Sequence, residues 1–276
     1  GDVMSSTKKK NIILGILGTI LSLIWLSPFY LMVVNSLKTK KEIFESPLKL
    51  PSGIQFENYK QAAENLSFAQ TFTNSIIITV VSVIIIIVFS SMAAYALSRV
   101  KSKVSSLIFF VFVAAMLIPF QAVMIPLVSF FGKLGMLNRP GIMFLYLGFG
   151  SSMAIFLYHG TINGISRSLD EAAIIDGCNR FQVFWYIIFP ILKPITVTVA
   201  ILNTIWIWND YLLPSLVINK LGSETIPLKM FFFFGEYTKQ WHLALAGLTI
   251  AIIPVIIFYF IAQKQIIKGI TAGSVK

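Results

Sequence analysis

The chain has 276 residues, of which 57% are hydrophobic and 12% are charged, and its mean hydropathy is +0.83. Soluble domains carry about 25% charged residues, so this composition excludes an ordinary soluble protein and predicts a membrane protein. The formal net charge of +11 is better explained by basic loops that set membrane topology than by a nucleic-acid-binding surface. Membrane lipid is therefore an expected partner, and nucleic acid is not.

Cysteine and histidine usage argues against a metalloenzyme or a disulfide-stabilised fold. Cys178 is the single cysteine, so no internal disulfide can form. His159 and His242 are far apart and lack an H-E-x-x-H frame, so no metal site is expected. An intramembrane enzyme needs paired aspartates, or histidine with glutamate, inside the bilayer. Only Asp210 lies within an apolar segment, so the sequence predicts no catalytic residue.

Apolar runs without acidic or basic residues mark the membrane spans, because a span needs about 20 apolar residues. We predict an all-α membrane protein whose six spanning helices lie near residues 12–36, 71–98, 105–130, 141–163, 194–218 and 241–263. The first run is too long for a cleaved signal sequence and is expected to remain as an anchor. A polar helix is expected near 57–65, within the loop 38–70.

Basic residues in the short connections predict the orientation of the chain. With the N-terminus inside the cell, the cytoplasmic side carries Lys8, Lys9, Lys10, Arg99, Lys101, Lys103, Arg167, Arg180, Lys193, Lys264, Lys268 and Lys276. This bias is modest, and it follows the positive-inside rule. It places both termini and the loop 164–193 in the cytoplasm of a multi-pass cell-membrane protein.

One connection, residues 168–190, is unusual because it is both acidic and apolar: SLDEAAIIDGCNRFQVFWYIIFP. Ser168 and Glu171 fit a capping box, Asp170 and Glu171 suit the positive end of a helix dipole, and Gly177 is placed to end the helix in a left-handed conformation. The pattern predicts a helix of about two turns, roughly 12 Å long. Such a short helix is marginal in isolation, so something must pack against it.

Two interpretations of this short helix follow from the residues. In the first, the helix lies on lipid headgroups, and Glu171 only caps it. In the second, the helix docks onto a soluble partner: Ala172 and Ala173 are small enough for close approach, and Glu171 and Asp176 would meet basic groups.

The spacing of this segment resembles the EAA loop of ABC-importer permeases. Glu171-Ala172-Ala173 is followed after three residues by Gly177, and then after nine by Ile187-x-Phe189-Pro190. The family pattern has leucine where Phe189 stands. The resemblance implies that this loop is a coupling helix in a cleft of an ATPase subunit, with Glu171 paired to a basic residue there and Gly177 allowing the turn. It also implies a type I importer permease fold with this helix between the fourth and fifth spans.

The chain has no G-x-x-x-x-G-K-[ST] sequence for binding nucleotide phosphates. We therefore expect no bound cofactor in this chain, and ATP and Mg are expected in partner subunits. Alternating access rocks two half-pores against each other, and a six-helix chain supplies one half. The resemblance to ABC-importer permeases implies as partners a second permease subunit, two ATP-binding subunits and an extracellular binding protein.

Further segments resemble one branch, the sugar importers of the maltose type, and within it the second permease. They are NSLKTKKEIF, LPSGIQFENYKQAAEN, IPFQAVMIPL, WNDY and the ending KGITAGSVK. The resemblance implies sugar or oligosaccharide import, and a tail in which Thr271, Ala272 and Gly273 contact the ATPase subunits. The alternative is an importer of the same type for a non-sugar solute. The expected divisions are a tail 1–10, a permease domain 11–263 with its loop 164–193, and a tail 264–276.

The WNDY segment, Trp208, Asn209, Asp210 and Tyr211, admits two roles. Ionisable groups inside a span usually face a wet cavity or a partner, and aromatic and amide groups suit a carbohydrate, which would place them on the translocation path. Alternatively, Asp210 caps a helix broken near Pro214 or hydrogen-bonds a neighbouring helix, a structural or gating role. The run Phe231–Phe234 would either reach a docked binding protein or lie in the membrane interface.

Overall fold

The computed structural model describes the backbone of residues 2–231 and 240–274, and the side chains of residues 8–231 and 240–265. The described chain is built from helices, which confirms the all-α class. It forms two compact units, one of Gly1–Phe68 with Met230–Val255 and one of Ala69–Lys229 with Ile256–Lys276.

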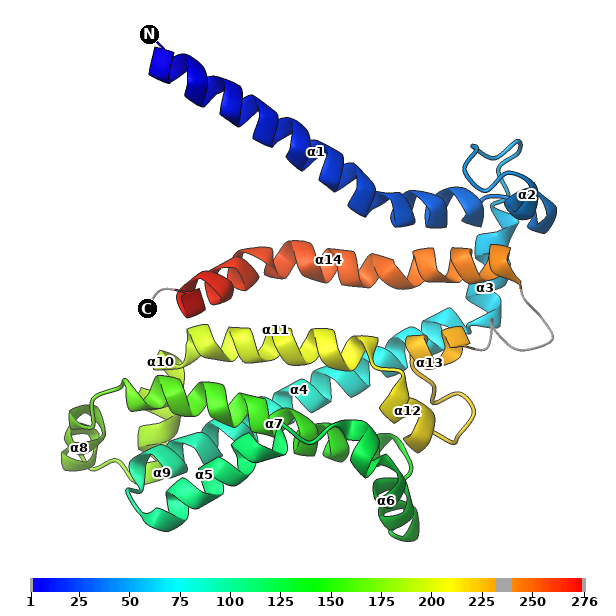
Figure 1. Ribbon diagram of the computed structural model, residues 1–276. Helices are drawn as coiled ribbons and strands as arrows, with labels where there is room; N and C mark the ends of the chain where they lie inside the picture. The colour runs from blue at the N-terminus through cyan, green and yellow to red at the C-terminus, as the bar shows by residue number, and fades with distance from the viewer. Residues whose placement is uncertain (1, 232–239, 275–276) are drawn as a thin grey trace. The chain divides into compact units, whose positions relative to one another are not determined.

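The first unit holds the N-terminal helix and the loop after it. Its helices are α1 (Asp2–Ser36), α2 (Lys40–Glu45), α3 (Glu57–Asn65) and the first part of α14 (Trp241–Ser274) (Figure 1). The bounds of α3 confirm the polar helix predicted near 57–65.

A buried lysine organises the connection between α1 and α3. The Lys38 side chain is fully buried. Its Nζ donates to Oδ1 of Asn35 at 3.0 Å and to the carbonyl oxygens of Ser46 at 2.8 Å and Pro47 at 3.3 Å. Asn58 Nδ2 donates to the Lys38 carbonyl at 2.8 Å. These bonds replace water around a buried ammonium group, whose burial would otherwise be costly.

The second unit contains the connection 164–193 and the helices on either side of it. Its elements are α4 (Phe68–Arg99), α5 (Lys103–Ala115), α6 (Phe120–Lys133), α7 (Arg139–Asn163), α8 (Ser168–Ile175), α9 (Arg180–Gln182), the π-helical segment η1 (Val183–Ile188), α10 (Phe189–Ile191), α11 (Lys193–Asn209), α12 (Leu212–Val217) and α13 (Ile226–Met230).

The core of the second unit lies where α4, α7 and α11 approach one another. Its fully buried side chains include Ile86 on α4, Tyr158 on α7 and Val199 on α11. A Cβ at Gly150 would lie 2.6 Å from Ile86 Cδ1 and 2.8 Å from Asn203 Oδ1, so a larger residue on α7 would force these side chains to move. Small residues at helix interfaces allow close packing in a membrane, where lipid is as apolar as the side chains.

Among the described residues, four helices are long and apolar enough to cross a membrane, namely Lys8–Ser36, Phe68–Arg99, Arg139–Asn163 and Trp241–Gln265. Two further candidates are bent pairs, so the count is six if each pair is one span.

The prediction of one continuous helix at 105–130 is wrong. The segment is divided into α5 and α6, which are bent by 103° at residues 116–119 (Figure 1). Pro119 adopts φ −67° and ψ 140°. Proline has no N–H to continue a helical ladder and pushes the preceding residue out of the helical region, which explains the break.

The fifth predicted helix, 194–218, is also discontinuous. α11 ends at Asn209, Asp210 is extended with ψ 128°, and α12 begins at Leu212. A proline ring clashes with the carbonyl four residues earlier in a continuous helix. For Pro214 that carbonyl belongs to Asp210, so the chain breaks there. A second bend, of 78°, separates Arg180–Ile191 from Lys193–Asn209.

Candidate functional site: the short helix α8

The start of α8 differs from the predicted capping box. Arg167 occupies the N-cap with helical φ −67° and ψ −21° and makes no capping bond through its side chain, whereas Ser166 Oγ accepts the Ser168 N–H at 3.3 Å. Ser168 is therefore the first residue of the helix, and its Oγ lies 2.7 Å from Ser166 Oγ instead. The capping box was wrong because the helical turn begins one residue earlier, which moves the Ser168 hydroxyl away from the free N–H groups.

The end of α8 confirms the role predicted for glycine. Gly177 has φ +92°, a conformation that L side chains rarely adopt. Its N–H donates to the Ile174 carbonyl at 3.0 Å, and the Cys178 N–H donates to the Ala173 carbonyl at 3.0 Å. This pair of bonds is a Schellman motif, which satisfies the last carbonyls of the helix and reverses the chain.

α8 has a buried face and an exposed face. Asp170 and Ala173, three residues apart, are 8% and 7% exposed and lie against the helices behind them. Glu171 and Ala172 are exposed, and Ile175 is 85% exposed. Ala173 thus shares the inward face with Asp170, whereas Ala172 faces outward, and the predicted contact of both alanines with a partner stays a prediction.

The predicted residues Asp176 and Gly177 are also exposed. We call the side chains of Ser168, Glu171, Ala172 and Ile175 the outer face of α8. A large apolar side chain beside a carboxylate and a small residue suits contact with another protein better than contact with water.

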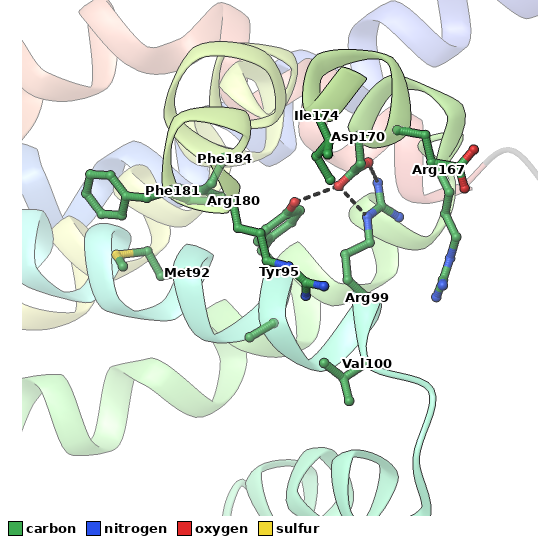
Figure 2. A pocket seen from close by; sticks show the side chains of 12 residues that line it. Met92, Tyr95, Arg99, Val100, Arg167, Asp170, Ile174, Arg180, Phe181 and Phe184 are labelled. Carbon is green, nitrogen blue, oxygen red and sulfur yellow. Dashed lines mark hydrogen bonds and ion pairs between the residues drawn. The ribbon is translucent and has the colours of Figure 1, made fainter. Parts of the chain in front are cut away.

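The buried face of α8 is joined to α4 by a bidentate ion pair (Figure 2). Arg99 Nη2 lies 2.8 Å from Asp170 Oδ2, and Arg99 Nε donates to Oδ1 at 3.1 Å. The Tyr95 hydroxyl donates to the same Oδ1 at 2.6 Å. The side chains of Arg99 and Asp170 are each 12% exposed, so water screens the pair far less than a surface ion pair. We call these three residues the Asp170 latch.

Further bonds link the latch to neighbouring backbone. Arg99 Nη1 donates to the carbonyl oxygens of Ile162 at 3.4 Å and Ile165 at 3.3 Å. Arg167, next to α8, donates from Nη2 to the Ser98 carbonyl at 3.1 Å. Two arginines thus connect the ends of α4 and α7 to α8.

A cavity of about 450 Å³ opens beside the latch (Figure 2). Its apolar wall includes Met92, Ile174 and Phe181, and its charged lining includes Glu171 and Arg180. Within the described part of the chain, the Arg180 side chain forms no hydrogen bond or ion pair. The cavity has the mixed lining of a protein contact rather than the convergent polar groups of a catalytic site.

Sequence reasoning missed the Asp170 latch. It assigned Asp170 only to the helix dipole and Arg99 only to membrane topology. Two signals were present: Asp170 and Ala173 share one helical face, and Arg99 directly ends an apolar run. The pairing itself could not be found, because 71 residues separate the two partners.

The residues Trp208 to Tyr211 lie at the break between α11 and α12. Asp210 Oδ1 accepts the Leu212 N–H at 3.0 Å, and Oδ2 accepts the Tyr146 hydroxyl of α7 at 2.9 Å. Both hydrogen bonds of the structural interpretation are therefore present. Asn209 Nδ2 donates to the Ile205 carbonyl of its own helix at 2.8 Å.

The aromatic members of this segment pack against helices. Trp208 meets Phe72 of α4 edge to face, with centroids 5.9 Å apart. Tyr211 is half-buried against the core. The role predicted for Trp208, Asn209, Asp210 and Tyr211 on a translocation path stays a prediction.

Two predicted segments lie largely outside the described residues. The backbone of Thr271, Ala272 and Gly273 continues α14, and their side chains are outside the described range. Phe231 is 55% exposed, and Phe232–Phe234 are outside the described range.

Comparison with known families decides what kind of protein carries this helix. Residues 86–272 match the family model of the binding-protein-dependent transport system inner membrane component. This match contains both α8 and the Asp170 latch. The chain belongs to this family of permeases.

Individual relatives of this permease cover nearly its whole length. It is 58% identical to the probable starch degradation products transport system permease protein AmyC of Thermoanaerobacterium thermosulfurigenes, over 99% of this chain and 100% of the relative. It is 36% identical to the multiple sugar-binding transport system permease protein MsmG of Streptococcus mutans, over 95% of each chain. It is 34% identical to the melibiose/raffinose/stachyose import permease protein MelC of Bacillus subtilis, over 99% of this chain and 100% of the relative.

The permease also resembles a solved chain from a bacterial ABC transporter involved in the import of the acidic polysaccharide alginate. The TM-score is 0.79 at 26% identity, covering 94% of this chain and 97% of that one. The permease is therefore a multi-pass membrane subunit of a binding-protein-dependent ABC transport system, and not its ATPase. These matches confirm the family that the EAA spacing predicted.

Proposed function

We propose that this permease is the second membrane subunit of an importer for starch-derived oligosaccharides. Its partners are another permease subunit, two ATP-binding subunits and an extracellular sugar-binding protein. The 58% identity to a probable permease for starch degradation products, over 99% of this chain and 100% of the relative, carries the choice of substrate class. Two further relatives named for sugars support a carbohydrate rather than another solute.

The outer face of α8 supports docking to an ATPase subunit. Ile175 is 85% exposed, next to the exposed Ala172 and Glu171. Burying an isoleucine stabilises a complex by about 1.5–3 kcal/mol, and Glu171 can pair with a basic group on the partner. Exposure of such residues is unfavourable unless another surface covers them.

The proposal places α8 and both termini in the cytoplasm. Arg99, Lys101 and Lys103 lie between the end of α4 and the start of α5, and Arg167 directly precedes α8, as the positive-inside rule requires for cytoplasmic connections. Thr271, Ala272 and Gly273 then reach the ATPase subunits from the end of α14. ATP and Mg bind those subunits, and this permease binds no cofactor.

Uptake by the reconstituted complex tests the proposal. Proteoliposomes containing both permeases, the ATPase and the binding protein should accumulate radiolabelled maltotriose when ATP is supplied. Labelled raffinose and alginate oligosaccharides serve as competitors. Uptake of either competitor in preference to maltotriose contradicts the substrate class, and failure of the ATPase to copurify contradicts the whole proposal.

A further inference from the structure

The geometry of the Asp170 latch restrains orientation as well as position. Two parallel N–H···O bonds join the Arg99 guanidinium to the Asp170 carboxylate, at 2.8 and 3.1 Å. Such a fork fixes the plane of both groups, unlike the single point contact of a lysine. Since each side chain is 12% exposed, a broken pair would leave a poorly hydrated charge, which is strongly unfavourable.

The covalent connections alone leave α8 free to rotate. The helix has eight residues, and an isolated helix needs about 12–15 residues to be even marginally stable. It is flanked by the short connection 164–167 and by the turn at Gly177. Non-covalent contacts must therefore hold its axis in place.

Those contacts lead to α4 rather than only to the helices next to α8 in sequence. Tyr95 and Arg99 both project from α4 to Asp170. Arg167 donates in the opposite direction, from the start of α8 to the Ser98 carbonyl of α4. The remaining Arg99 bonds reach the Ile162 and Ile165 carbonyls at the end of α7.

We infer that Asp170 and Arg99 are positioning residues for energy coupling. The latch makes α8 and the adjoining ends of α4 and α7 move as one body. A displacement applied to the outer face of α8 therefore reaches α4, although Arg99 and Ser168 lie far apart in the sequence. This inference rests on the proposed function, because it requires the ATPase to push on α8.

A distance measurement in the assembled importer tests the shared movement without altering the latch. Spin labels are placed at Leu169, on the flank of α8, and at Lys101, just beyond α4, after Cys178→Ser removes the single native cysteine. The Leu169–Lys101 distance distribution should be the same in nucleotide-free and ATP-bound complexes. A shift or a second population that depends on nucleotide would overturn the inference.

Two substitutions test the consequence for transport. Asp170→Asn removes the charge, whereas Arg99→Lys keeps the charge and removes the fork. Each should lower the substrate moved per ATP hydrolysed, with Asp170→Asn lowering it about tenfold, the size of a typical pairwise coupling. ATP hydrolysis per assembled complex should stay near the unaltered rate, which a general folding defect would not allow.

Lys133→Gln is the control, because Lys133 is an exposed basic residue at the end of α6 and lines neither the latch nor the cavity beside it. It should leave the transport-to-hydrolysis ratio unchanged. If Asp170→Asn or Arg99→Lys transports at the unaltered ratio, the positioning role is wrong.

A cross-link separates this inference from the docking proposal. With Ile175→Cys on the outer face of a chain that carries Cys178→Ser, a bifunctional thiol reagent should capture the ATPase both with and without Asp170→Asn. No capture in either chain contradicts docking itself. If the ATPase is captured in both chains and Asp170→Asn keeps the unaltered transport-to-hydrolysis ratio, only the role of the latch is contradicted.

Discussion

The hydroxyl of Tyr146 lies 2.9 Å from Oδ2 of Asp210 and donates a hydrogen bond to it. Asp210 simultaneously accepts the Leu212 N–H through Oδ1, so one carboxylate caps α12 and joins it to α7. Tyr146 is fully buried, and its ring meets Trp206 edge to face at 5.4 Å. Both carboxylate oxygens of Asp210, the only acidic residue of this span, therefore accept hydrogen bonds from the permease itself.

Substitutions at Asp210 should reveal its two separate roles. Asp210→Asn retains one acceptor oxygen and should cost about 1 kcal/mol, whereas Asp210→Ala removes both acceptors and should cost about twice as much. Tyr146→Phe removes the hydroxyl and keeps the contact with Trp206, so it should match Asp210→Asn. Thermal unfolding of the purified complex measures these differences. Equal stability of Asp210→Ala and the unaltered chain would refute the capping role.

Charge reversal on the outer face of α8 should prevent assembly with the ATPase. Glu171→Lys places a cation where a basic partner group is expected, and like charges at an interface cost several kcal/mol. The variant should insert into membranes normally, because Glu171 is exposed and outside the core. The measurement is the amount of ATPase that copurifies with Glu171→Lys. Glu64→Gln on α3 is the control and should copurify a normal amount. Normal copurification of Glu171→Lys would contradict docking through this residue.

Any residue other than glycine should strain the backbone at position 177. A Cβ there would have free space, since no heavy atom lies within 4 Å, so the penalty comes only from φ +92°. The expected cost of Gly177→Ala is about 1–2 kcal/mol. Gly160→Ala is the matched control: Gly160 also has nothing within 4 Å, and it lies inside α7, where alanine is favoured. In thermal unfolding, Gly160→Ala should be the most stable, the unaltered chain intermediate and Gly177→Ala the least stable. If Gly177→Ala is not the least stable of the three, the strain argument is contradicted.

Loss of the buried Lys38 ammonium should loosen the loop between α1 and α3. Lys38→Met leaves the Ser46 and Pro47 carbonyls without their donor, at about 1–3 kcal/mol for each buried group. Limited proteolysis should then cut residues 46–56 faster than in the unaltered chain. Lys41→Met should change nothing, because the Lys41–Glu45 pair is exposed, with side chains 82% and 64% accessible. Equal cleavage of both variants would show that Lys38 does not hold the loop.

Glu42 should make the same loop sensitive to acid. Its Oε1 accepts the Ser52 N–H at 2.6 Å, and this bond lowers the pKa of Glu42 below its ordinary value of 4.5. A lowered folded-state pKa stabilises the loop above the ordinary value and loses that effect as the pH falls through the lowered pKa. Hydrogen exchange of peptides containing Ser52, corrected for intrinsic rates, should show this loss. In Glu42→Gln the corrected exchange should not depend on pH, and a persisting dependence would assign the effect to another group.

Local features of this permease were set by the sequence alone. The apolar runs identified where the spans lie, because about 20 apolar residues are needed to cross a bilayer wherever the chain later packs. The polar helix α3 and the left-handed turn at Gly177 were also predictable, since hydrogen bonds within a few residues determine them. The spacing from Glu171 to Pro190 identified the family because the whole pattern lies within one short stretch of sequence.

The tertiary structure decided everything that depends on distant partners. Asp170 could cap a helix or form an ion pair, and only folding brings Arg99, 71 residues earlier, to 2.8 Å. Burial of Ala173 but not Ala172 follows from that same contact, because the latch selects which face of α8 turns inward. The break at Asp210 combines a local cause, Pro214, with a distant one, Tyr146. Hydrophobic patterning determines which segments enter the membrane, whereas specific polar contacts between segments determine their orientation, and a single sequence does not encode those pairings in its periodicity.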